Sequence, residues 1–200
     1  MRVSGGRIEL PTDFSSSAID WPPVYELMRL FHASPNTHLD GEVLGPIQGL
    51  SYFQERQLSN GLAWVEEVLE GGRPEHCQTR LGAVFASMTL LECGTFAYGE
   101  QRYRLEDPHF FEIEMDGPTV APMALVGFMA MFAHEAAALS EIASEYWQPK
   151  QAWLYSECFA PTATILSHVD PPPRLASSTV LSPYPKDWSL AKRLWPAPLR

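Results

Sequence analysis

The chain has 200 residues, of which 46 % are hydrophobic and six are tryptophan, and its formal net charge is −10. This length and apolar content predict one globular domain with a sizeable core rather than a disordered chain. The acidic balance leaves no electrostatic footprint for duplex nucleic acid or for an anionic membrane surface, so polyanions are poor candidate partners.

The three cysteines, Cys77, Cys93 and Cys158, form an odd set without a Cys-x-x-Cys pair. Such a set predicts neither a disulfide framework nor a structural zinc site. The N-terminal residues lack the apolar core of a secretory signal. His134 and Glu135 interrupt the most apolar stretch before it reaches the length of a membrane span. We therefore expect a cytoplasmic protein without a membrane partner, and delivery into another cell stays open.

Proline, glycine and serine concentrate at both ends of the chain, which predicts irregular segments over 1–23 and 170–200 around a single domain. Strands and helices alternate between them without a regular βαβ repeat or a glycine-rich phosphate motif, so we predict an α+β fold. In chain order, the predicted elements are a strand within 24–34, a helix within 58–72, a strand within 81–87, a helix from Ser87 toward Tyr98, an alternating strand within 109–118, one long helix over 122–147 and one or two strands within 152–173.

Glu157 stands out among the acidic residues because apolar and aromatic residues flank it in "WLYSECF". A glutamate inside such a strand is expensive to bury unless it has a task or a partner. The alternative is a glutamate at a strand edge that faces water.

Three separated blocks share an order that points to a known family. They are "FHASP" at 31–35, "AVFASMTLLECGTFAYG" at 83–99 and "LYSECF" at 154–159. This order of histidine, aromatic strand-to-helix unit and glutamate resembles the ADP-ribosyltransferase family, in particular its diphtheria-toxin and poly(ADP-ribose) polymerase branch with the His, Tyr, Glu constellation. The first two blocks are also similar to the rifampin ADP-ribosyltransferases. The resemblance is limited to these three short blocks.

The resemblance implies a role for each matching residue. His32 would hydrogen-bond the adenosine ribose of NAD, the Ala33 backbone would hold the nicotinamide amide, and Ser34 would be the small hydroxyl residue that follows. Glu157 would bind the nicotinamide ribose and stabilise the oxocarbenium-like centre that forms when the glycosidic bond breaks. The alternative for His32 is an ordinary half-buried histidine.

The second block would supply the clamp for the nicotinamide ring. Phe85 and either Phe96 or Tyr98 would stack on the two faces of the ring. Ser87 would be a polar contact, as in the arginine-modifying branch, or simply the N-cap of the following helix.

Two positions depart from the family pattern. Ala33 stands where the family usually has glycine, which narrows the available backbone angles. Phe85 replaces the usual tyrosine, so stacking survives but the phenol's hydrogen bond is lost.

Arg80 would either neutralise the NAD pyrophosphate or lie on the surface. No metal site is expected, because His32 and His38 have no acidic residue or cysteine near them at the spacing of zinc ligands.

The resemblance therefore implies a split β-sandwich with flanking helices that uses NAD as a substrate and transfers ADP-ribose to an unknown acceptor. The biological role of such a transferase, as a toxin, effector, defence factor or housekeeping enzyme, stays open. The acceptor would be a protein or a small molecule rather than a nucleic acid, given the acidic charge. Two alternatives stay open: an NAD glycohydrolase, and a catalytically silent module of the same fold that binds NAD, ADP-ribose or a protein.

Overall fold

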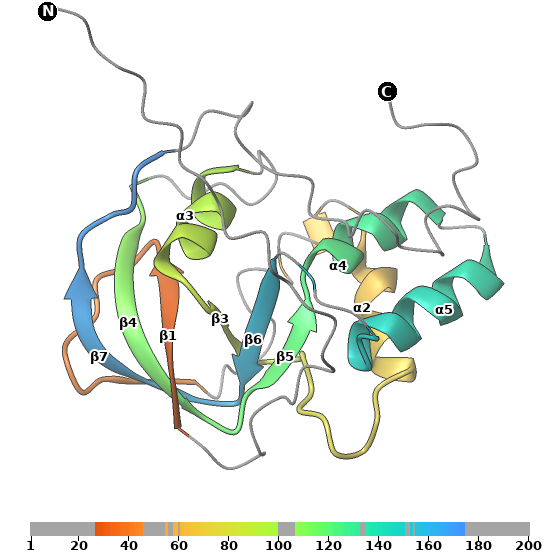
Figure 1. Ribbon diagram of the computed structural model, residues 1–200, viewed down its shortest axis with the longest axis horizontal. Coiled ribbons are helices and arrows are strands. Elements are labelled where there is room, and N and C mark those ends of the chain that lie inside the picture. The colour runs from red at the N-terminus through yellow and green to blue at the C-terminus, as the bar shows by residue number, and fades with distance from the viewer. Residues whose placement is uncertain are drawn as a thin grey trace, which may run out of the picture.

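The computed structural model describes residues 27–45, 55, 58–59, 61–99, 107–132, 135–150, 153 and 155–174. The irregular segments predicted at the two ends lie outside these residues, apart from 170–174, which belong to no helix or strand. The described part is a mixture of strands and helices, so the predicted α+β class is confirmed (Figure 1).

Seven strands form one antiparallel sheet in the order β2-β7-β4-β1-β3-β6-β5. The strands are β1 (Leu27–Ser34), β2 (Val43–Leu44), β3 (Val84–Ser87), β4 (His109–Asp116), β5 (Thr119–Pro122), β6 (Ser156–Ala160) and β7 (Ala163–Val169). The helices are α2 (Ala63–Gly71), α3 (Leu90–Gly99), α4 (Ala124–Met129), the 3₁₀ helix η1 (Ala130–Phe132) and α5 (Ala136–Trp147).

The strand pairing in the sheet is shortest at its centre, between β1 and β3. β1 pairs with β4 along its whole length, from Leu27 opposite Asp116 to Ser34 opposite His109. Toward β3, in contrast, the pairing within the described residues is the single pair Phe31 and Ser87. The sheet thus consists of a half β2-β7-β4-β1 and a half β3-β6-β5 that meet at this seam.

The helices cover one face of the sheet. α2, α4 and α5 gather beside β5 and β6, whereas α3 packs near β1 (Figure 1). Alternation along the strands separates the cores, because successive side chains point to opposite faces. Phe85 and Phe159 pack against the helices, while the residues next to them, Ala86 and Cys158, pack with Leu30 and Ile113 on the other face.

The single long helix predicted over 122–147 is wrong. Pro122 ends β5, α4 and η1 follow, and Glu135 then breaks the helical path with φ −116° and ψ 80° before α5 begins. The physical reason is packing: α5 contacts α4 as well as α2 and β5. One straight helix could not bring 124–129 and 136–147 into contact with each other. In the part of the chain that the structure describes, no helix has the length and apolar character needed to cross a membrane.

Candidate functional site

The three sequence blocks lie on three neighbouring strands. His32, Ala33 and Ser34 end β1, Phe85 and Ser87 belong to β3, and Glu157 belongs to β6. The order β1-β3-β6 places these strands side by side (Figure 1). Ser87 pairs with Phe31 of β1 on one side and with Glu157 of β6 on the other. Residues that are far apart in the sequence therefore form one row across the sheet.

His32 bridges the seam between the two halves of the sheet. Because side chains alternate along β1, the His32 ring points to the face of Leu30 and Phe111, opposite to the face of Phe85 and Glu157. Its Nδ1 lies 2.8 Å from the carbonyl oxygen of Phe85. Because a carbonyl can only accept, Nδ1 donates and Nε2 is left as an acceptor. Burial lowers the pKa of His32, against the opposing effect of the Phe85 carbonyl, and nearby His38 lowers it further. The ring is therefore neutral at pH 7, and its side chain is half-buried, as one of the two descriptions from the sequence expects.

Ser34 belongs to a hydrogen-bonded chain in the turn after β1. Its Oγ lies 3.1 Å from Nε2 of His38, and Nδ1 of His38 lies 2.9 Å from Oε1 of Glu42. The carboxylate can only accept, so Nδ1 donates to it. The backbone N–H of Asn36 donates to the same Oγ at 3.1 Å. The backbone N–H of Leu39 and the His38 ring also lower the pKa of Glu42. These contacts fix the turn that follows β1.

Glu157 is buried, at 4 % exposure, and its carboxylate is held by two donors. The Tyr146 hydroxyl donates to its Oε1 at 2.6 Å, and Nη1 of Arg80 donates to the same oxygen. Burial raises the pKa of Glu157, although Arg80 and Tyr146 pull it down. The expectation that Glu157 faces water at a strand edge is therefore wrong, because β5 pairs beyond β6 and the helices cover its face.

Arg80 is the residue of this site whose environment the sequence did not reveal. The surface arginine expected at this position is wrong, since its exposure is 0 %. Its guanidinium lies 5.0 Å from the ring centre of Phe85, 5.2 Å from Tyr146 and 5.6 Å from Phe159. The carboxylate of Glu66 pairs with it at 2.9 Å. The pKa of Arg80 rises well above its usual value, because the nearby Glu157, Tyr146 and Glu66 outweigh the opposing effect of burial. It therefore stays a cation.

Phe85 lies on the same face as Glu157 and contacts Phe159, with ring centres 5.5 Å apart. Ser87 is buried at the end of β3, opposite Glu157. The prediction that Ser87 caps the next helix is wrong. The helix begins at Leu90, and Thr89 forms the capping pair: its Oγ1 accepts from the Glu92 backbone N–H at 3.2 Å, and Glu92 accepts from the Thr89 backbone N–H at 3.0 Å.

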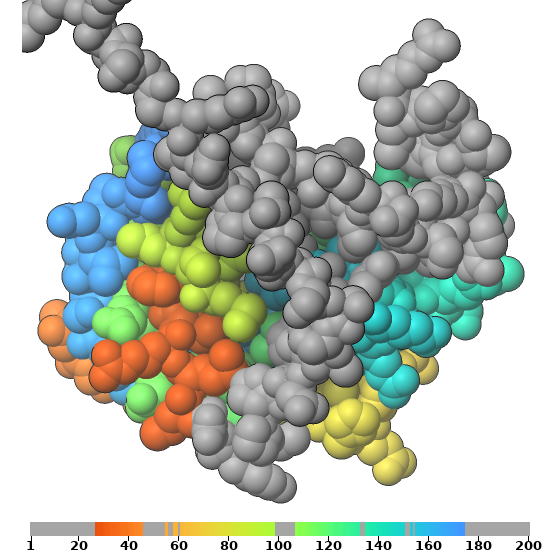
Figure 2. All heavy atoms as spheres, viewed as in Figure 1, coloured from red at the N-terminus to blue at the C-terminus, as the bar shows by residue number. Residues whose placement is uncertain are grey.

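The two aromatic candidates of the second block lie on α3. Tyr98 packs against Phe110 at 5.6 Å between ring centres, and the Arg174 guanidinium lies 4.6 Å from its ring centre. Phe96 is half-buried on the same helix. In the space-filling view, the residues of α3 lie beside those of β1 on the visible face, with α5 further to the right (Figure 2).

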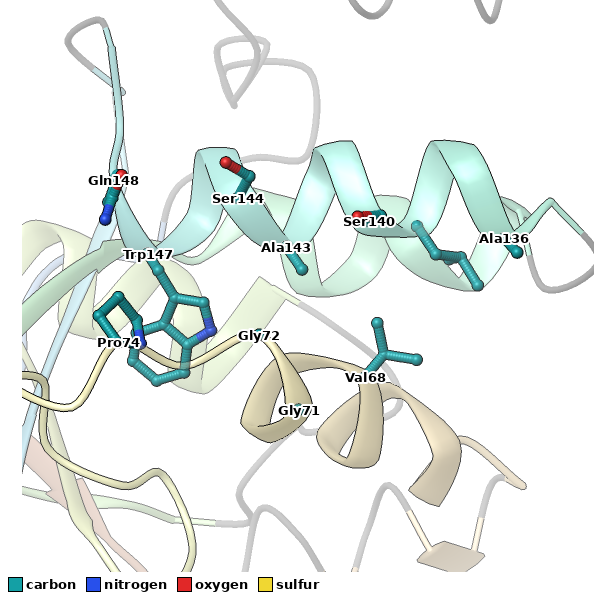
Figure 3. Close-up of a pocket in the computed structure, with 11 residues that line it drawn as sticks. Val68, Gly71, Gly72, Pro74, Ala136, Ser140, Ala143, Ser144, Trp147 and Gln148 are labelled. Carbon is teal, nitrogen blue, oxygen red and sulfur yellow. The ribbon is translucent and has the colours of Figure 1, made fainter.

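A separate groove of about 450 Å³ opens between α2 and α5. Figure 3 shows Val68, Gly72 and Pro74 on one side of it and Ala143 and Trp147 on the other. None of the candidate residues lines this groove. Within the described ranges, no group of three or more histidine, cysteine or acidic side chains is arranged to hold a metal ion.

Sequence patterns could have indicated part of the network behind Glu157. Tyr146 stands at helical spacing from Leu139 and Ile142 in the predicted long helix, which is typical of a buried position. Glu66 carries no such signal, because it is one of several acids on α2. No protein-family model matches the chain, and no curated protein matches it.

Proposed function

We propose that the protein is an NAD-dependent ADP-ribosyltransferase that breaks the nicotinamide glycosidic bond and passes ADP-ribose to an acceptor. The observation that carries the proposal is the row Phe31, Ser87 and Glu157, which joins the three family-like blocks on adjacent strands. The narrow seam between β1 and β3 and the helices beside it also favour the split β-sandwich that the resemblance implies.

His32 has the protonation state that its proposed role needs. The bond from Nδ1 to the Phe85 carbonyl fixes the neutral tautomer, in which Nε2 accepts a hydrogen bond. A ribose hydroxyl is a suitable donor for that nitrogen. The adjacent Ala33 backbone and Ser34, held by its turn contacts, would complete the NAD corner at the end of β1.

Glu157 provides the carboxylate for the chemical step. Its Oε1 is fixed by Tyr146 and Arg80, and no residue of the described ranges bonds its Oε2. We assign Oε2 to the nicotinamide ribose hydroxyl. As the carbon–nitrogen bond breaks, its electron pair leaves with the nicotinamide nitrogen and positive charge develops on the ribose, where a carboxylate stabilises it. The acceptor's lone pair then forms the new bond to the ribose carbon, and its proton passes to Glu157 or to solvent.

The nicotinamide ring would stack on Phe85, with Phe96 or Tyr98 on its other face. Ser87, next to Glu157 in the same row, would be a polar contact. The acceptor is a protein side chain or a small molecule, and with water as the acceptor the same chemistry gives an NAD glycohydrolase.

One observation favours a second candidate, a catalytically silent NAD-binding or protein-interaction module of the same fold. Glu157 is 4 % exposed, and its Oε1 is already bound to Arg80. In such a module Glu157 would serve as the structural partner of a buried arginine and would never meet a substrate.

Nicotinamide release from NAD by the purified protein tests the proposal. We expect release in the wild type and its loss in Glu157→Gln, which preserves the side chain's volume. Thermal stabilisation by NAD without release would favour the silent module, because binding to the folded state alone raises the melting temperature. Neither stabilisation nor release, even with cell extract supplying acceptors, would reject an NAD role.

A further inference from the structure

Two glutamates of α2 hold Arg80 by hydrogen bonds, and Nη1 of its guanidinium contacts Glu157. Glu66 accepts from Nε at 2.9 Å and from Nη2 at 3.2 Å. The Arg80 backbone N–H also donates to Oε1 of Glu70 at 2.7 Å. A guanidinium held in this two-pronged way keeps one orientation. The direction of the remaining Nη1 is thus set by Glu66.

The guanidinium of Arg80 is packed among aromatic rings. Phe85, Tyr146 and Phe159 surround it at 5.0 to 5.6 Å between the guanidinium carbon and the ring centres. Nη1 donates to the Tyr146 hydroxyl oxygen and to Oε1 of Glu157, and the Tyr146 hydroxyl donates to that same Oε1. The orientation of the Glu157 carboxylate is therefore fixed through one oxygen.

The charges in this cluster show why Glu66 matters beyond holding Arg80. Arg80 contributes +1, and Glu66 and Glu157 contribute −1 each, so the ionised cluster carries −1. Without Glu66, Arg80 would cancel the charge of Glu157, and a neutral pair stabilises a developing cation poorly. Tyr146 adds no charge at neutral pH, because burial raises its pKa well above the usual 10.0.

We propose that Glu66 and Arg80 are positioning residues for Glu157: Arg80 fixes Oε1, and Glu66 both orients Arg80 and offsets its charge. This role rests on the proposed ADP-ribosyl transfer. Within the described residues, the charged or titratable groups that face Glu157 are Glu66 from α2, Arg80 from the connection between α2 and β3, and Tyr146 from α5.

The two positioning residues act on the protonation of Glu157 with opposite signs. Arg80 lowers the pKa of Glu157, and Glu66 raises it by a smaller amount. Removing the charge of Glu66 should therefore move the acidic limb of the pH profile of kcat to lower pH. Removing both residues should move it to higher pH, because the larger effect of Arg80 is then lost.

The test compares Glu66→Gln with Glu67→Gln, a control on the same helix whose side chain is exposed. For Glu66→Gln we expect kcat for nicotinamide release to fall about tenfold, the size of one lost charge interaction. The Kd for NAD should stay within about twofold, since binding does not use the lost charge. The acidic limb of the pH profile of kcat should move to lower pH. Glu67→Gln should match the wild type in all three measurements.

A double variant, Glu66→Leu with Arg80→Met, removes this ion pair as a unit but also takes the cation from buried Glu157, so its melting temperature is recorded to show that it stays folded. Without Arg80, Glu157 is loosely held and harder to ionise, so we expect lower kcat and an acidic limb at higher pH. The Glu157 carboxylate is also titrated by carbon NMR in each variant.

The outcomes separate the two proposals. An active wild type whose Glu66→Gln variant keeps its kcat and acidic limb overturns the positioning role alone. A Glu157 pKa that does not fall in Glu66→Gln overturns it as well. A wild type without nicotinamide release overturns the proposed function, and the positioning role with it, even where the NMR titration shows the coupling.

Discussion

Glu157 and Ser87 pair directly across β6 and β3, and the same Ser87 pairs with Phe31 at the seam where the two halves of the sheet meet. The row is continuous although its members come from distant parts of the chain. His32, next to Phe31, donates across the seam to the Phe85 carbonyl. The candidate site therefore depends on the seam for its geometry, and the predictions below start there.

His32→Ala should destabilise the fold by about 1 kcal/mol, because the half-buried Phe85 carbonyl loses its donor. His32→Gln keeps an N–H donor and should recover much of that loss. Urea unfolding monitored by tryptophan fluorescence measures both. Equal stability of the alanine variant and the wild type would mean that the ring does not hold the seam.

The stability of the wild type should depend on pH through His32. Burial lowers its pKa below the usual 6.5 in the folded state. Its contribution is therefore fully present above pH 6.5 and is lost as the pH falls toward the folded-state pKa, because the unfolded chain binds a proton before the folded one does. The free energy of unfolding of the wild type should fall more steeply below pH 6.5 than that of His32→Gln. Parallel curves would contradict the lowered pKa of this half-buried ring.

Thr89→Ala should cost about 1 kcal/mol, because it removes the hydroxyl that caps α3. Since Ser87 ends β3 and does not cap the helix, Ser87→Ala should cost less. Thermal unfolding of the two variants decides between them. A larger loss in Ser87→Ala would restore Ser87 as the cap.

The thiols offer a chemical check of the core. Cys93 and Cys158 are buried, and burial raises the pKa of each to about 12, whereas Cys77 is partly exposed. A disulfide reagent at pH 8 should therefore modify one thiol rapidly in the native protein and all three in denaturant. Rapid modification of two or three thiols in the native state would contradict the packing of β6 and α3.

Alternating apolar residues predicted a strand within 109–118, and β4 covers His109–Asp116 of it. Periodicity also predicted the strand that contains His32 and the helix within 58–72, of which α2 covers Ala63–Gly71. It failed over 122–147, where a long apolar run hid the break at Glu135. Local patterns record which side chains are apolar but not where the chain must turn to bury them.

The pairing of Arg80 with Glu157 had no local signal. The two residues are 77 positions apart, and an isolated arginine near a strand is usually exposed. The adjacency of the three blocks followed from the family resemblance rather than from periodicity. Burial of a charge depends on partners that only the fold brings together, so neither residue alone predicted the network.

The central claim is tested most directly by measuring nicotinamide release from NAD by the wild type and by Glu157→Gln, with the melting temperature of each recorded alongside. The account predicts steady release by the wild type and a loss of at least about a hundredfold in a variant that remains folded. Equal release by the two proteins, or none by a folded wild type supplied with acceptors, would contradict it.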